Sequence, residues 1–105
     1  MKYKKKILLH KPSIKGNELI YLKKCIKTEW VSSAGSYVEL FESKISKYTG
    51  SKYAVSCING SSALHIALIL AKVKKNHEVL VPSLTFIAPV NSIIYNLANP
   101  VFFDS

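Results

Sequence analysis

Residues 53–104 read YAVSCINGSSALHIALILAKVKKNHEVLVPSLTFIAPVNSIIYNLANPVFFD, and this stretch decides the fold. Short apolar runs bounded by turn residues alternate in it with segments long enough to form helices. The pattern predicts strands at 53–58, 78–82 and 100–104 and helices at 61–72 and 87–97. Such a βαβαβ series implies an α/β fold with a mainly parallel sheet and right-handed crossovers.

An amphipathic helix is expected ahead of this series, at residues 17–28. Its apolar side chains recur at helical spacing and predict a surface helix packed on one side, with a stripe of Leu19, Leu22 and Ile26. The short apolar run at 7–9 is a further strand candidate. Because no repeat or low-complexity linker interrupts the sequence, no domain boundary is expected within residues 1–105.

A second helix is expected to begin at Ser36. Ser36 and Glu39 have the spacing of a capping box, which satisfies the first free amides of a helix. Apolar side chains recur at helical spacing up to about residue 48, and Gly50 is placed to end the helix.

The positive net charge suggests a nucleic-acid partner, but the kind of basic residue argues against one. The formal charge is +9, but all 15 basic residues are Lys and none is Arg, the side chain that binds phosphates as a planar fork. Since the lysines are also scattered, we expect no nucleic-acid partner. A non-catalytic basic binding module stays as the alternative from another functional class.

Other classes of protein are also disfavoured by composition. No apolar run approaches the roughly 18 residues of a membrane span, so no membrane partner is expected. Cys25 and Cys57 lie far apart, without a CxxC pair or a His cluster, which predicts reduced thiols and no metal site. A cytoplasmic protein is the expectation.

The segment Asn59-Gly60-Ser61-Ser62 lies where a predicted strand turns into a helix. Glycine allows close approach of a ligand to the backbone, and the amides at a helix start attract anions, so phosphate binding is expected here. An equally weighted alternative is that Ser61 or Ser62 merely caps the helix. There is no GxGxxG and no GxxxxGK[ST], which excludes the usual dinucleotide and nucleoside triphosphate motifs.

A second candidate segment, Pro82-Ser83-Leu84-Thr85-Phe86, follows the next predicted strand. Ligands of open α/β sheets gather outside the carboxyl ends of the strands, so this segment and the Gly60 turn should face one crevice. Phe86 beside an anion site would suit a flat aromatic ring that carries a phosphate. The alternative is that Phe86 is a core aromatic.

Several motifs, in order along the chain, resemble those of the DegT/DnrJ/EryC1/StrS aminotransferases. They are WVSSAG at 30–35, FE at 41–42, YTG at 48–50, NGSSALHIAL at 59–68, EVLVPSLTF at 78–86 and PVFFD at 100–104. The resemblance implies the N-terminal part of the large domain of the fold-type-I transferase fold, a three-layer αβα arrangement. It also implies pyridoxal 5'-phosphate (PLP) as cofactor.

The resemblance assigns roles to individual residues. It implies that the Gly60 turn, through the backbone amides of Ser61 and Ser62, holds the cofactor phosphate, and that Phe86 stacks on the pyridine ring. Ser61-Ser62 replaces the family's usual Thr-Ala, a change that backbone contacts tolerate. Asn76-His77 replaces the usual Gly-Asp, and Asn76 is expected to keep a left-handed turn.

The loop after the first helix resembles a segment that the family uses near the sugar-nucleotide site or the dimer interface. Its substrate-binding candidates are Trp30, Ser32, Ser33 and Tyr37. The alternative is a loop anchored by a buried Trp30. His65 is expected to be a packed histidine, and no role follows for Asn91.

The activity that the resemblance implies is transamination of a nucleotide-linked keto-sugar, with an amino acid such as glutamate as donor and a homodimer as the full-length assembly. The family's cofactor-binding lysine, the acidic partner of the ring nitrogen and the C-terminal domain are expected beyond Ser105. No catalytic residue is therefore assigned here, and the chain alone is expected to be inactive. A PLP-dependent sugar dehydratase of the same family is an alternative.

Overall fold

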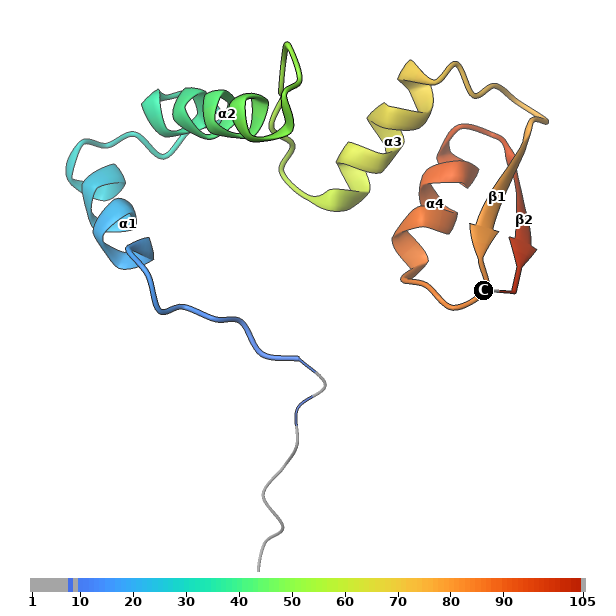
Figure 1. Cartoon of the computed structure of the whole chain (residues 1–105), viewed down its shortest axis with the longest axis horizontal. Helices are drawn as coiled ribbons and strands as arrows, with labels where there is room; N and C mark the ends of the chain where they lie inside the picture. Colours follow the sequence, from blue (N-terminus) through green and yellow to red (C-terminus); the bar gives the residue numbers. More distant parts are fainter. Residues whose placement is uncertain (1–7, 9, 105) are drawn as a thin grey trace, which may run out of the picture. The chain divides into compact units, whose positions relative to one another are not determined.

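The computed structural model describes Leu8 and residues 10–104, and the chain divides into two compact units, Met1–Ser36 and Tyr37–Ser105 (Figure 1). The first unit holds one helix. The second holds the remaining helices and a pair of strands, in the order α2, α3, β1, α4, β2. The candidate phosphate turn and Phe86 both belong to the second unit.

Helix α1 covers Glu18–Lys27, as the apolar spacing predicts. The expected packing of its stripe is wrong for the described chain: no α1 residue is buried, and Leu19, Leu22 and Ile26 are between 60 and 69% exposed. Within the first unit α1 is the only described helix, so no other helix or strand of that unit covers its apolar stripe. The strand candidate at 7–9 lies outside the described residues except for Leu8, which is not in a strand.

Helix α2 covers Ser36–Thr49 and confirms the second predicted helix, but the capping box expected at its start is wrong: Ser36 already lies inside the helix, and neither Ser36 nor Glu39 makes a side-chain hydrogen bond within residues 10–104. Gly50 follows it with φ of +72°, the left-handed conformation that ends helices and that glycine adopts at no steric cost. The hydroxyl of Ser46 donates to the carbonyl oxygen of Ser51 at 2.7 Å, which ties the next residue back to the helix. The predicted end of the helix is therefore confirmed.

The predicted strand at 53–58 is wrong. The described residues form one sheet with two strands, and neither of them includes this segment. Its apolar side chains are not buried either, since Tyr53 is 74%, Val55 82% and Ile58 92% exposed. Strands need a hydrogen-bonded neighbour, and residues 53–58 have none within the described part of the chain, so the segment is irregular.

Strands β1 (Glu78–Pro82) and β2 (Asn99–Phe103) pair in parallel, which confirms the expected sheet type. The register runs from Glu78 opposite Asn99 to Pro82 opposite Phe103. Asn76 precedes β1 with φ of +67°, which confirms the left-handed turn predicted there.

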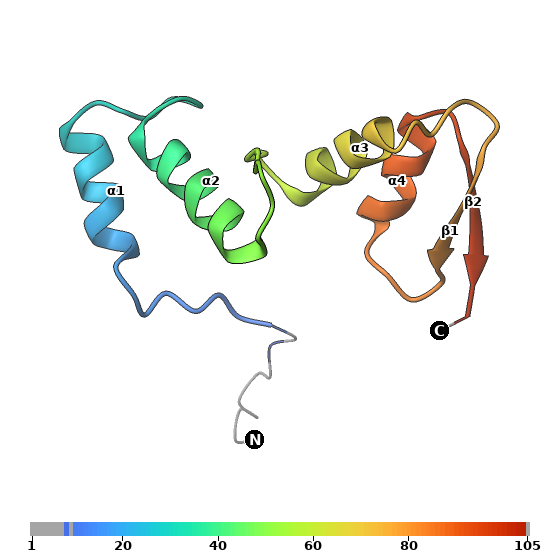
Figure 2. The ribbon, with the colours of Figure 1, turned by 45° about the horizontal axis from the view of Figure 1, so that its top comes forward.

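Helices α3 (Gly60–Leu70) and α4 (Ile87–Tyr95) confirm the two remaining predicted helices with slightly different ends. Helix α4 connects the two strands and packs against both of them and against α3, so it lies between α3 and the sheet (Figures 1 and 2). The small core forms at this junction, where Val81, Ile93 and Ala98 are buried.

Three helices end with a residue other than glycine in the left-handed conformation. In α3 the amide of Lys72 donates to Ile69 at 2.9 Å and the amide of Val73 donates to Leu68 at 3.0 Å, the two bonds of a Schellman motif. The left-handed residues that follow α1, α3 and α4 are Glu29, Lys72 and Leu97, with φ of 57 to 60°. Each carries the steric cost that glycine would avoid.

Candidate functional site

The start of α3 is capped by Asn59. Its backbone is extended, with φ of −158° and ψ of 169°, and its side-chain Oδ1 accepts a hydrogen bond from the amide of Ser62 at 2.9 Å. Its carbonyl oxygen accepts from the amide of Ala63 at 3.2 Å. The alternative in which Ser61 or Ser62 caps the helix is therefore wrong, because asparagine already fills that role.

Two amides at this helix start face no acceptor. Within residues 10–104, no group accepts a hydrogen bond from the amide of Gly60 or of Ser61. A Cβ placed on Gly60 would meet no atom within 4 Å, so the space beside this turn is open. Free amides at the positive end of a helix suit a phosphate, and the residues present therefore fit the phosphate of PLP.

The contacts between α3 and α4 show how the two helices are aligned. Ser61 near the start of α3 lies beside Ser92, with 3.3 Å between the Ser61 carbonyl oxygen and the Ser92 Oγ. One turn further on, His65 meets Tyr95 edge to face with ring centroids 5.6 Å apart, which supports a packed histidine. Since the later residue of α3 contacts the later residue of α4, the two helices run parallel and begin at the same end of the pair.

Phe86 lies at this shared end. It precedes Ser92 by six residues, about 9 Å of helix, and so projects beyond the start of α3. The aromatic ring is 83% exposed and lines a shallow hollow with Leu84 and Thr85. The core alternative for Phe86 is wrong in the described chain, because no described side chain covers the ring.

Ser92 also lies in this region, although no sequence motif indicated it. It is 0% exposed, and its Oγ donates to the carbonyl oxygen of Ala88 at 2.8 Å while also touching Ser61. The only sequence signal is one small polar residue, beside Asn91, inside a mainly apolar helix. Such a residue is usually small enough to allow two helices to approach closely.

The loop after α1 is organised around Trp30. Its amide donates to the carbonyl oxygen of Cys25 at 3.0 Å, and its ring covers Gly35, where an added Cβ would lie 3.3 Å from the Trp30 Cε3 atom. Gly35 has φ of +150°. The alternative of a buried Trp30 is wrong, because the side chain is 59% exposed.

The other substrate candidates divide between the two units. Ser32 and Ser33 are exposed in the first unit, and Tyr37 is half-buried in the second. Their role in substrate binding therefore stays a prediction.

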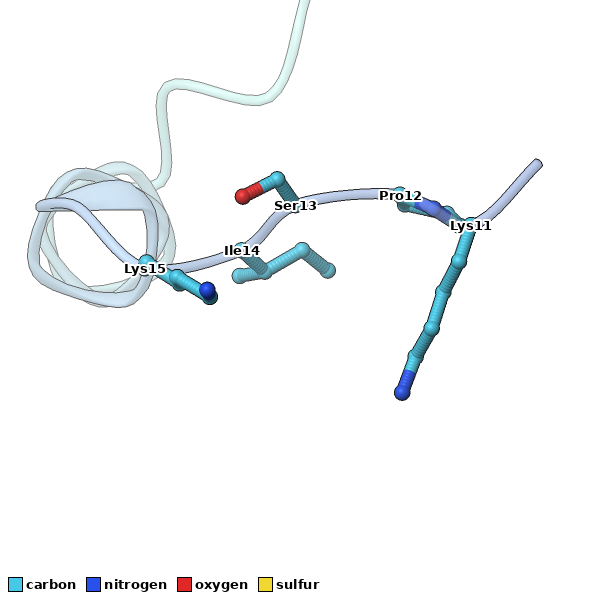
Figure 3. Close-up of a pocket in the computed structure, with 5 residues that line it drawn as sticks. All are labelled: Lys11, Pro12, Ser13, Ile14 and Lys15. Carbon is cyan, nitrogen blue, oxygen red and sulfur yellow. The ribbon is translucent and has the colours of Figure 1, made fainter.

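A further hollow is lined by five consecutive residues, Lys11, Pro12, Ser13, Ile14 and Lys15 (Figure 3). The figure shows their side chains along one extended stretch, with Lys11 directed away from Ser13. Since no other described residue lines it, this hollow supports no binding site. Among the described residues no cluster of His, Cys, Asp or Glu could hold a metal ion, and no helix is long and apolar enough to cross a membrane.

Residues 12–105 match the DegT/DnrJ/EryC1/StrS aminotransferase family, and the chain belongs to this family. The match includes both the Gly60 turn and Phe86. The family resemblance of the sequence motifs is thereby confirmed.

The relatives include two GDP-perosamine synthases. The one from Escherichia coli O157:H7 is 42% identical over 105 residues, which are 100% of this chain and 28% of that protein. The one from Caulobacter vibrioides is 44% identical over 94 residues, 90% of this chain and 25% of that protein. The chain thus spans about a quarter of the length of the curated relatives it matches.

Solved structures confirm the fold class. An aminotransferase from Psychrobacter cryohalolentis has 32% identity and a TM-score of 0.78, over 87% of this chain and 23% of that one. Spr1654 of Streptococcus pneumoniae in its PLP form has 27% identity and a TM-score of 0.78, over 89% and 24%. The described α/β unit therefore has the fold of PLP-dependent sugar aminotransferases.

Proposed function

We propose that the chain provides the phosphate-binding part of the cofactor site in a PLP-dependent sugar aminotransferase. The observation that carries the proposal is the pair of free amides, Gly60 and Ser61, at the helix end beyond which the exposed ring of Phe86 projects. PLP, when bound, acts as the electron sink for transamination. The protein's part is to hold the phosphate and to orient the ring.

The free amides and nearby hydroxyls of the turn support the following proposed contacts. The amides of Gly60 and Ser61 donate to phosphate oxygens, and the hydroxyls of Ser61 and Ser62 are available beside them. The amide of Ser62 is already bonded to Asn59, so it contributes only if that bond is shared. Phe86 covers one face of the pyridine ring.

The substrate in this proposal is a nucleotide-linked keto-sugar. Its support is the family membership together with relatives named for GDP-perosamine synthesis. An amino acid such as glutamate is the proposed donor, a homodimer the proposed assembly and the cytoplasm the proposed location. Trp30, Ser32, Ser33 and Tyr37 are the proposed contacts to the sugar nucleotide.

A sugar dehydratase of the same family is the second candidate. A solved GDP-4-keto-6-deoxymannose-3-dehydratase has 24% identity and a TM-score of 0.70, a likeness that shows the fold alone. No residue among those described favours the dehydratase. The aminotransferase is therefore preferred, because a relative from Bacillus subtilis with 38% identity over 101 residues is named as a pyridoxal phosphate-dependent aminotransferase.

We also propose that the 105-residue chain alone binds the cofactor phosphate without transferring amino groups. The support is that it corresponds to about a quarter of each of those relatives. Titration of the isotope-labelled chain with PLP and with inorganic phosphate, followed by NMR, tests the proposal. The amide signals of Gly60 and Ser61 should shift with both ligands, and signals of Phe86 should shift with PLP only. Unchanged amide signals at saturating PLP would contradict it.

A further inference from the structure

We propose that Glu42 is a positioning residue for the phosphate turn, which it reaches through Ser56. This inference rests on the proposed phosphate site and adds to it a residue outside the turn. Glu42 lies on α2, and Ser56 lies in the irregular segment that leads into Asn59 and Gly60.

The contact is a double hydrogen bond to a single carboxylate oxygen. The amide of Ser56 donates to Glu42 Oε1 at 2.7 Å, and the Ser56 hydroxyl donates to the same oxygen at 2.9 Å. The bond from the Ser56 amide, followed by the bond from its hydroxyl, holds the pKa of Glu42 below its usual value. Hydrogen bonds to an ionised acceptor are stronger than those between neutral groups.

This contact matters because the segment 53–58 has little else to hold it. It has no strand neighbour, and Glu42 is its only hydrogen-bond partner within residues 10–104. Ser56 is three residues before Asn59, so at most about 11 Å of chain separates the anchored residue from the cap of α3. An anchor this close restricts where the cap and the free amides can lie.

The turn is held on its other side by α4. There the buried Ser92 lies against the carbonyl oxygen of Ser61 at 3.3 Å. Two contacts therefore hold the phosphate turn: Glu42 binds Ser56 ahead of the turn, and Ser92 contacts Ser61 within it. Loss of the Glu42 contact would leave only the second of these anchors.

The test compares Glu42→Ala, Glu42→Gln and Ser56→Ala in the full chain with Glu39→Gln as the matched control. Glu39 lies one turn earlier on α2 and makes no side-chain hydrogen bond to any described residue, so its replacement removes the same charge without touching Ser56. Hydrogen exchange of the Ser62 amide reports the Asn59 cap without any ligand. Titration with PLP reports phosphate binding, and urea unfolding reports overall stability.

Glu42→Ala should speed exchange at Ser62 and weaken PLP binding, each by about fivefold, under conditions where the variant is fully folded. Glu42→Gln and Ser56→Ala should lie between this variant and the wild type, because a neutral acceptor or one donor is retained. Glu39→Gln should match the wild type.

A variant Glu42→Ala that loses overall stability, yet keeps wild-type exchange at Ser62 and wild-type PLP affinity, would overturn the positioning role. Absence of PLP binding by the wild-type chain would instead contradict the proposed function. In that case exchange at Ser62 still decides the role of Glu42: unchanged exchange in the Glu42 variants overturns it, and faster exchange in the Glu42 and Ser56 variants, with Glu39→Gln unchanged, supports it.

Discussion

The hydroxyl of Ser92 in α4 lies 3.3 Å from the carbonyl oxygen of Ser61 in α3, and the Ser92 side chain is completely buried. The contact joins the helix that follows Phe86 to the first turn of the helix that begins at Gly60. It therefore aligns the two helices along their axes. The alignment also sets how far Phe86 lies from the free amides of Gly60 and Ser61.

Ser92→Val should destabilise the chain by about 1–3 kcal/mol, because the larger side chain would push the two helices apart. Ser92→Ala should change stability by less than about 1 kcal/mol, since the lost hydrogen bond is offset by the better helix propensity of alanine. Urea unfolding of both variants measures the difference. Equal stability of Ser92→Val and Ser92→Ala would show that the helices do not meet closely at this position.

Lys72→Gly should stabilise the chain by about 0.5–1 kcal/mol. Lys72 has φ of 60° at the end of α3, and glycine adopts this conformation without the clash of a Cβ. Lys72→Ala is the matched control, because it removes the same long side chain and retains the Cβ. Thermal unfolding should rank Lys72→Gly above both the control and the wild type; a variant no more stable than Lys72→Ala would contradict the left-handed helix end.

Phe86→Ala should weaken PLP binding by on the order of 1 to 3 kcal/mol, the scale of a lost aromatic stack with its burial. Folding should be almost unaffected, because the ring is 83% exposed in the protein. Leu84→Ala, in the same hollow and 89% exposed, is the control and should keep more of the affinity. Equal PLP affinity in Phe86→Ala and the wild type would rule out the stacking role.

Glu42 should make stability depend on pH on the acid side. Its pKa is lowered from the ordinary 4.5 by the hydrogen bonds from Ser56. The carboxylate therefore contributes stability that is present above pH 4.5 and is lost as the pH falls through the lowered value. The difference between wild type and Glu42→Gln in urea unfolding should be largest near neutral pH and shrink in acid. If the difference in unfolding free energy between the wild type and Glu42→Gln stays constant with pH, the ionised carboxylate of Glu42 does not stabilise the protein through Ser56.

The sequence predicted the helices well because their signals are local. The end of α2 follows from Gly50, and the left-handed turn at Asn76 follows from the tolerance of asparagine for that conformation. The left-handed ends at Lys72 and Leu97 were not predicted, because neither residue favours them. There the Schellman hydrogen bonds outweigh the local preference.

The strand at 53–58 failed because a strand depends on a neighbour that local sequence does not specify. The candidate site formed by Gly60, Ser61, Ser62 and Phe86 stays a prediction: the first three residues begin α3, Phe86 directly precedes α4, and the described residues that line the hollow at Phe86 are Leu84 and Thr85. Its details came only from the structure. Asn59 caps α3 in place of the serines, and Ser92 and Glu42 make contacts across 31 and 14 residues of sequence that no local pattern reveals.

Replacing Gly60, the first residue of α3, with proline tests phosphate binding by the free amides most directly. Proline lacks an amide but is well tolerated at this helix position, and the extended backbone of Asn59 suits a residue before proline. Gly60→Ala is the control, because it retains the amide and no atom of the described residues lies within 4 Å of the added Cβ. PLP titration should show binding at least about fivefold weaker for Gly60→Pro than for Gly60→Ala, with both variants folded. Equal PLP affinity in the two variants would contradict phosphate binding by the amides at the start of α3.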